Sequence, residues 1–108
     1  MAIIELNEAN FNETIEAAFE KHQTVILKFG SELCDACMVQ GFELEELDEL
    51  LKELVILEID LSESEALSYE FDITEVPTTI IFKNRDTILL REKGIILAAD
   101  MQKIIKEA

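Results

Sequence analysis

The sequence is poor in the residues that interrupt or loosen a fold. Its 108 residues include three glycines, one proline and no tryptophan. Such a composition argues against a disordered or linker-rich chain and favours a packed globular protein. Because no internal repeat, low-complexity tract or Pro/Gly/Ser-rich linker divides the sequence, we expect one domain over residues 1–108.

Long hydrophobic segments are also missing. No run approaches the roughly 20 apolar residues that a membrane span needs. The first residues, MAIIELNEANFNE, lack the basic start and the apolar stretch of a secretory signal. We therefore expect a cytoplasmic protein that makes no use of a membrane.

Basic residues are scarce. Nine Lys and Arg stand against 24 Asp and Glu, which gives a formal net charge of -15. This charge repels nucleic acid and anionic membranes, and it favours partners with basic docking surfaces. The same charge can serve solubility alone, because runs of charge commonly form solvated faces. Exposed acidic helices also favour a monomer.

Hydrophobic periodicity predicts an alternation of strands and helices. We expect a capping box at Asn10 and Glu13 to open the first helix, and Ser62 to cap a short helix that runs through Phe71. The expected strands are Ile3–Leu6, Thr24–Phe29, Leu54–Ile59, Thr79–Phe82 and Thr87–Leu90. The longer helices are expected near residues 11–19, 34–52 and 97–105.

The element order is therefore β-α-β-α-β-α-β-β-α. Right-handed crossovers make the first three strands parallel, and the short turn at residues 83–86 makes the last pair antiparallel. The predicted fold class is α/β, a three-layer α/β/α sandwich around a mixed five-stranded sheet.

Chemistry is predicted at the only two cysteines, Cys34 and Cys37. A C-x-x-C spacing within a βαβ pattern is typical of a redox pair. A thiol in the first turn of a helix lies near unpaired N–H groups and the positive end of the helix dipole, which stabilise its thiolate. Cys34 is thus the expected nucleophile, and Cys37, one turn further on, is the expected resolving thiol.

The same spacing is half of a zinc site. A structural zinc needs four ligands, and no second cysteine pair exists, so we expect no metal within one chain. A zinc site or cluster shared between two chains stays open at this point. His22, the only histidine, could act as a base or ligand, but its place between Lys21 and Gln23 favours a polar loop residue.

Three segments together resemble the thioredoxin family over nearly the whole chain. They are KFGSELCDAC after a buried strand, Asp60 at the end of the next strand, and EVPTTIIFKN in the C-terminal part. The resemblance implies a thioredoxin-like fold, reduction of disulfide-bearing proteins without a cofactor, and a thioredoxin-reductase-like electron donor. It also implies that the Val76–Pro77 bond is cis and lies beside the dithiol, where the Val76 backbone pairs with substrate. Without the resemblance, the expectation for an X–Pro bond would be trans.

The chain departs from the family around the cysteines. The family commonly has Trp-Cys-Gly-Pro-Cys, whereas this chain has Leu33, Cys34, Asp35, Ala36 and Cys37. Asp35 places a negative charge beside Cys34 and should disfavour its thiolate. We therefore expect a reducing couple rather than a strongly oxidising one.

Lys28 is the most serious departure, because the family has a buried proton-relaying aspartate at this place. A lysine could favour the Cys37 thiolate by its charge or take part in proton transfer. Alternatively, it only pairs with Glu58 on the neighbouring strand. The family's second helix is often kinked at a proline, and this chain has Gly41 there, which permits a kink without enforcing one.

A second function remains compatible with these departures. The fold could be kept for docking, with weak redox activity. That hypothesis predicts that Cys34→Ser leaves partner binding intact.

Overall fold

The computed structural model describes residues 3–108, and its elements follow the predicted order. In chain order they are β1 (Ile3–Leu6), α1 (Phe11–Glu20), β2 (Thr24–Gly30), α2 (Asp35–Leu50), β3 (Leu54–Asp60), α3 (Glu65–Glu70), β4 (Thr78–Asn84), β5 (Thr87–Lys93) and α4 (Ala98–Lys106).

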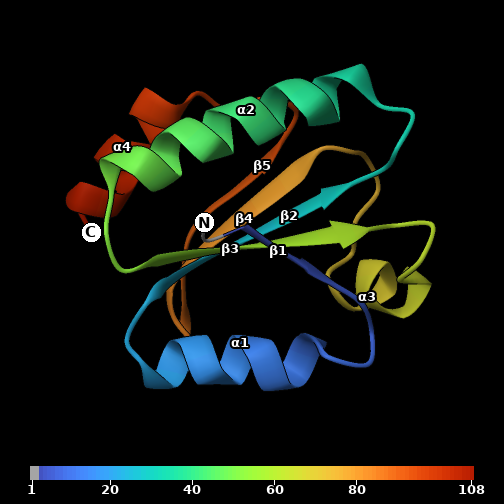
Figure 1. Ribbon diagram of the computed structural model, residues 1–108, viewed down its shortest axis with the longest axis horizontal. Helices are drawn as coiled ribbons and strands as arrows, with labels where there is room; N and C mark the ends of the chain where they lie inside the picture. The colour runs from blue at the N-terminus through green and yellow to red at the C-terminus, as the bar shows by residue number, and fades with distance from the viewer. Residues whose placement is uncertain (1–2) are drawn as a thin grey trace.

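One mixed sheet forms the middle layer. Its strand order is β1-β3-β2-β4-β5, with β1, β3 and β2 parallel and β4 and β5 antiparallel to their neighbours. Helices α2 and α4 cover one face, whereas α1 and α3 lie on the other (Figure 1). The predicted three-layer α/β/α sandwich is confirmed.

The hydrophobic core lies on both faces of β2 and β3, as expected for strands with nearly continuous apolar sequence. On β2, Leu27 and Phe29 pack with the core under α1 and α3, whereas Ile26 packs with the core under α2 and α4. Lys28 has the same strand parity as Ile26, so its side chain enters the layer between the sheet and α2.

Two predicted helix caps are wrong. Asn10 is the N-cap residue of α1, but its side chain makes no capping hydrogen bond to the helix. Its Oδ1 instead accepts from the Asn7 backbone N–H at 2.9 Å, while Asn7 Oδ1 accepts from Ala9 N and Asn10 N. Ser62 lies before α3, where its Oγ donates to Asp60 Oδ1 at 2.7 Å. In both cases the side chain forms hydrogen bonds with nearby loop groups instead of capping the helix.

Several boundaries also differ from prediction. Helix α2 ends at Leu50. Strands β4 and β5 extend to Asn84 and Lys93, because backbone pairing continues where the apolar pattern stops. Leu97, predicted on the apolar stripe of the last helix, is the exposed residue just before α4.

The β4–β5 turn is tied to α1 by charge. Arg85 forms an ion pair with Glu16 and lies over the Phe19 ring, 5.6 Å from its centroid. The hydrogen bonds that Arg85 donates hold the pKa of Glu16 below its usual value. This anchor lies on the α1 side of the sheet.

We predict that Phe29→Ala lowers the free energy of unfolding by about 3–5 kcal/mol, because it empties a fully buried site. Phe29 is 0% exposed and its ring contacts Phe71, with centroids 5.6 Å apart. Chemical denaturation measures the change. The matched control Phe42→Ala removes a ring that is 60% exposed and should cost less than about 1 kcal/mol. Equal losses would contradict this core assignment.

Candidate functional site

The two cysteines lie where β2 hands over to α2. Strand β2 ends at Gly30, a short loop follows, and Cys34 is the N-cap residue of α2. The Cys34 sulfur accepts the backbone N–H of Cys37 at 3.1 Å. An anion at this position would face the open N–H groups and the positive end of the helix dipole.

The cysteines are joined by a disulfide, and their Cα atoms are 5.2 Å apart. Cys34 is half-buried, whereas Cys37 is only 4% exposed. An incoming disulfide can therefore reach Cys34 more readily than Cys37. This difference in access fits the predicted roles of nucleophile and resolving thiol.

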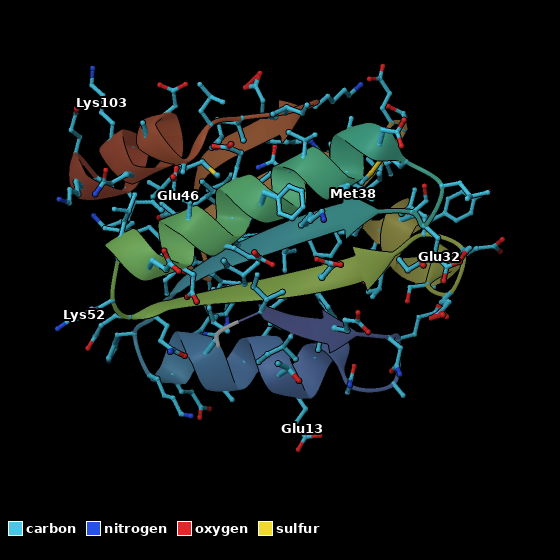
Figure 2. All side chains as sticks on the ribbon, turned by 45° about the horizontal axis from the view of Figure 1, so that its top comes forward. Glu13, Glu32, Met38, Glu46, Lys52 and Lys103 are labelled. Carbon is cyan, nitrogen blue, oxygen red and sulfur yellow. A yellow bond between two sulfur atoms is a disulfide. The ribbon has the colours of Figure 1, made fainter. Side chains whose placement is uncertain are left out.

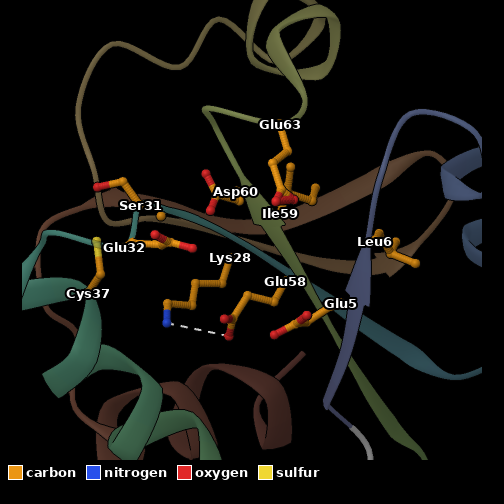
Figure 3. Close-up of a pocket in the computed structure, with 11 residues that line it drawn as sticks. Glu5, Leu6, Lys28, Ser31, Glu32, Cys37, Glu58, Ile59, Asp60 and Glu63 are labelled. Atoms are coloured by element: carbon orange, nitrogen blue, oxygen red, sulfur yellow. Dashed lines mark hydrogen bonds and ion pairs between the residues drawn. The ribbon is translucent and has the colours of Figure 1, made fainter.

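A polar pocket of about 200 Å³ opens beside Cys37. Figure 3 shows Cys37, Lys28 and Glu58 pointing into it from α2, β2 and β3. The pocket is also lined by four acidic residues, Glu5, Glu32, Asp60 and Glu63. Lys28 is the one basic residue among the described residues that line it.

Lys28 is buried and pairs with Glu58, Nζ to Oε2, at 3.4 Å. The predicted structural pairing is thus present. Lys28 also lies next to the dithiol, because a Cβ added to Gly30 would meet both Cys37 Sγ at 3.4 Å and Lys28 Cε at 3.7 Å. The absence of a side chain at Gly30 lets the helix and the lysine approach each other at this point.

A row of polar residues crosses the otherwise apolar sheet at this level. Glu5 is the register partner of Glu58, Glu58 of Lys28, Lys28 of Thr79, and Thr79 of Glu92. Register partners project to the same face of a sheet. Thr79 Oγ1 is buried and has no hydrogen-bond partner among the described residues, so the row adds a further polar atom to the layer beneath α2.

Gly41 has a role that the sequence did not reveal. Helix α2 runs without interruption from Asp35 to Leu50, so the glycine does not divide it. A Cβ at Gly41 would lie 3.3 Å from Lys28 Nζ. The glycine therefore leaves room for the ammonium group under the helix.

The Val76–Pro77 bond is cis, as the family resemblance implies. Pro77 is buried and Val76 is half-buried. Since Thr78 pairs with Phe29 at the end of β2, the two residues lie at the same edge of the sheet as the loop that leads to Cys34.

The remaining candidate residues, Leu33, Asp35 and His22, are all exposed. Leu33 is fully exposed next to Cys34, and Asp35 is exposed in the first turn of α2. His22 is an exposed turn residue with a positive φ of 58°, in keeping with the polar loop interpretation. Among residues 3–108, no three His, Cys, Asp or Glu side chains come together as a metal site would require.

Sequence reasoning missed Gly30, Gly41 and Thr79 as parts of this site. Glu58, which is not among these, carried a signal, since it interrupts the apolar run of β3. Thr79 carried none, because it follows another threonine at the start of β4. The glycines carried none, because their importance depends on which helix crosses which strand.

None of the helices in the described part of the chain has the length and apolar character that a bilayer crossing demands.

Known proteins resemble this chain throughout its length. The thioredoxin family model matches residues 2–107. "Thioredoxin 2" of Plasmodium falciparum is 29% identical over 101 residues, which cover 93% of this chain and 64% of the relative. Thioredoxin of Staphylococcus haemolyticus is 27% identical and covers 82% of this chain and 81% of that protein. The chain thus spans less than two thirds of the Plasmodium relative.

The fold is also found among solved structures. Chloroplastic thioredoxin z superposes with a TM-score of 0.86 and 24% identity, covering 99% of this chain and 94% of that one. This likeness concerns the fold.

We predict that Asp35→Asn raises the fraction of Cys34 present as thiolate, because it removes an adjacent negative charge. In reduced protein carrying Cys37→Ser, Cys34 is the only thiol, and its alkylation rate can be followed against pH. The midpoint should move down by a few tenths of a pH unit, since water and salt screen an exposed charge. Glu46→Gln, further along α2, is the control and should leave the midpoint in place. An upward movement with Asp35→Asn would contradict the prediction.

Proposed function

The chain belongs to the thioredoxin family, and on that premise we propose that it is a thiol-disulfide oxidoreductase that reduces disulfides in proteins. The proposal rests on the difference in solvent exposure between the two cysteines at the start of α2, since Cys34 is accessible and Cys37 is buried.

The proposed reaction has two exchanges. The Cys34 thiolate attacks one sulfur of the substrate disulfide, forms a mixed disulfide and releases the other substrate sulfur as a thiolate. The Cys37 thiolate then attacks the Cys34 sulfur, releases the second substrate thiolate and closes the Cys34–Cys37 disulfide. Two electrons pass from the dithiol to the substrate, and both released thiolates take protons from water.

Substrate contacts are proposed at residues that flank Cys34. The Val76 backbone, next to Pro77, lies at the same sheet edge as the dithiol and would pair with an extended substrate segment. Leu33 offers an apolar surface where the family commonly has an aromatic side chain. The negative charge of Asp35 disfavours the thiolate form of Cys34.

The closing exchange needs a thiolate at Cys37, and burial disfavours that charge. Lys28 offers a compensating positive charge in the same pocket. Gly30 and Gly41 leave space for its side chain, and Glu58 holds its ammonium group from the far side. We therefore assign to Lys28 the electrostatic support of the Cys37 thiolate, with Glu58 as its positioning partner.

The oxidised protein must be reduced again to act repeatedly. A thioredoxin-reductase-like flavoenzyme, or another dithiol donor, would return two electrons to the Cys34–Cys37 disulfide. We propose the cytoplasm as the compartment, because its reducing conditions keep such dithiols available, and a monomer as the working form.

The variants Cys34→Ser and Cys37→Ser separate the two exchanges. With a peptide disulfide as substrate, Cys37→Ser should accumulate a mixed disulfide with one peptide chain, visible as an added mass. Cys34→Ser should form no such adduct at this position and should lose reductase activity by at least about a thousandfold, as expected when a nucleophile is removed. Undiminished binding of a protein partner by Cys34→Ser, with no reduction by the unaltered chain, would favour the docking role.

Lys28→Met tests the assignment of the lysine. A preformed mixed disulfide at Cys34 releases its peptide when Cys37 attacks. This release should slow by about tenfold at neutral pH, because loss of a nearby positive charge lowers the fraction of Cys37 present as thiolate by about tenfold or more. The pH midpoint for alkylation of Cys37, measured in a Cys34→Ser background, should rise as well.

The Lys28→Met protein should still fold, since an apolar replacement for a buried ion-pair member is often tolerated. Lys103→Met, at an exposed lysine of α4, is the control and should change neither readout. If Lys28→Met also leaves release and alkylation unchanged, the lysine serves only in pairing with Glu58.

A further inference from the structure

Helix α2 carries apolar side chains on two opposite sides of its first half. The inner side has Cys37 and Leu44, both buried, together with the buried amide of Gln40. On the outer side, Met38 is 62% exposed and Phe42 is 60% exposed. A helix that only covers a core would place polar residues on that outer side.

Three exposed apolar residues are neighbours on the outer side of α2. Met38 and Phe42 are four residues apart, and Val39, also exposed, is three residues from Phe42, so the three side chains are neighbours on the helix. Leu33, fully exposed, precedes the N-cap residue Cys34. Met38 lies one turn after Cys34, whose backbone oxygen accepts the Met38 N–H at 3.2 Å, so the outer apolar residues begin one turn from the accessible cysteine. Contiguous exposed apolar surface of this kind marks an interaction site more often than scattered single residues do.

Acidic residues surround this surface. Asp35 lies on the same side one turn before Met38, and Glu45, Glu46 and Glu49 continue that side beyond Phe42, all of them exposed. Figure 2 shows Met38 and Glu46 along α2 and Glu32 on the loop before it, with Glu13 on the opposite side of the molecule. The apolar patch thus lies in a region of negative electrostatic potential.

We propose that this outer face of α2, defined as Leu33, Met38, Val39 and Phe42 with the acidic residues around them, docks protein substrates whose disulfide is flanked by a large apolar side chain and by lysine or arginine. The inference rests on the proposed function and names its substrate class. Apolar contact supplies affinity, whereas charge complementarity steers encounter and discriminates between substrates.

Charge also decides against the other occupants. A second copy would bring the same acidic residues to this face and a net charge of -15 over its whole chain, and like charges across an interface are strongly unfavourable. Anionic nucleic acid and lipid surfaces meet the same repulsion. A basic protein surface is instead attracted by the negative potential of this face.

Two disulfide peptides of equal length test the proposal. Both carry one phenylalanine beside the disulfide, and they differ only in having three lysines or three glutamates in the flanks. At low salt, the reduced protein should reduce the lysine peptide at least about tenfold faster, and the advantage should shrink as salt screens the charges.

Paired variants locate the effect on the protein. Glu46→Gln with Glu49→Gln on the outer face of α2 should lower the preference for the lysine peptide at least about threefold. Glu13→Gln with Glu20→Gln, which removes the same charge from α1, should lower it less. Phe42→Ser should slow reduction of both peptides while leaving the charge preference in place. Denaturation midpoints confirm that each variant is folded.

The outcomes are distinct. Reduction of both peptides at one rate, or equal losses from the two glutamate pairs, would overturn the docking face while leaving the reductase function standing. If the unaltered protein reduces neither peptide and forms no adduct with them in the Cys37→Ser background, the proposed function and the docking face fall together.

Discussion

The site depends on the fixed place where α2 begins. Cys34 can present its sulfur to solvent and to the helix N-terminus only if α2 starts directly after the loop that follows β2. Two contacts from α2 fix that start against the C-terminal segment. Gln40, fully buried, exchanges hydrogen bonds with both backbone groups of Ile96, and Glu43 accepts the N–H of Ala98 at the first turn of α4 at 2.8 Å. These bonds anchor the second and third turns of α2 to the segment that leads into α4.

The polar row beneath α2 is the feature that a stable fold alone does not need. Burying Lys28 in the layer next to the sheet costs free energy, and its pairing with Glu58 offsets only part of it. The chain accommodates the group with two glycines, Gly30 and Gly41, where a Cβ would come within 3.7 Å and 3.3 Å of the lysine side chain. Such an arrangement makes sense beside a buried sulfur that must carry a negative charge during one step of a reaction. An apolar core at this level would stabilise the fold and leave Cys37 without a counter-charge.

Much of this could be predicted from the sequence, for identifiable reasons. The strands β2 and β3 are nearly continuous β-branched and leucine runs, the C-x-x-C pair is the only cysteine pair, and the cis bond at Pro77 followed from the family resemblance. Asn10 and Ser62 were misjudged because capping depends on which of several nearby partners a short polar side chain meets first. Gly41 and Thr79 were invisible, since their part in the site arises from the crossing of α2 over β2 and from strand register. Local sequence carries little information on either.

The central claim is that Cys34 and Cys37 form a working dithiol within one chain. Its most direct test is to equilibrate the purified protein in dithiothreitol buffers of graded potential and to count free thiols by mass. The account predicts a reversible loss of the mass of two hydrogen atoms, with a midpoint between about -300 and -200 mV, in the range of reducing thioredoxin-type couples. Thiols that never pair, or that pair only between chains, would contradict it, and so would a midpoint near the roughly -120 mV of strongly oxidising couples.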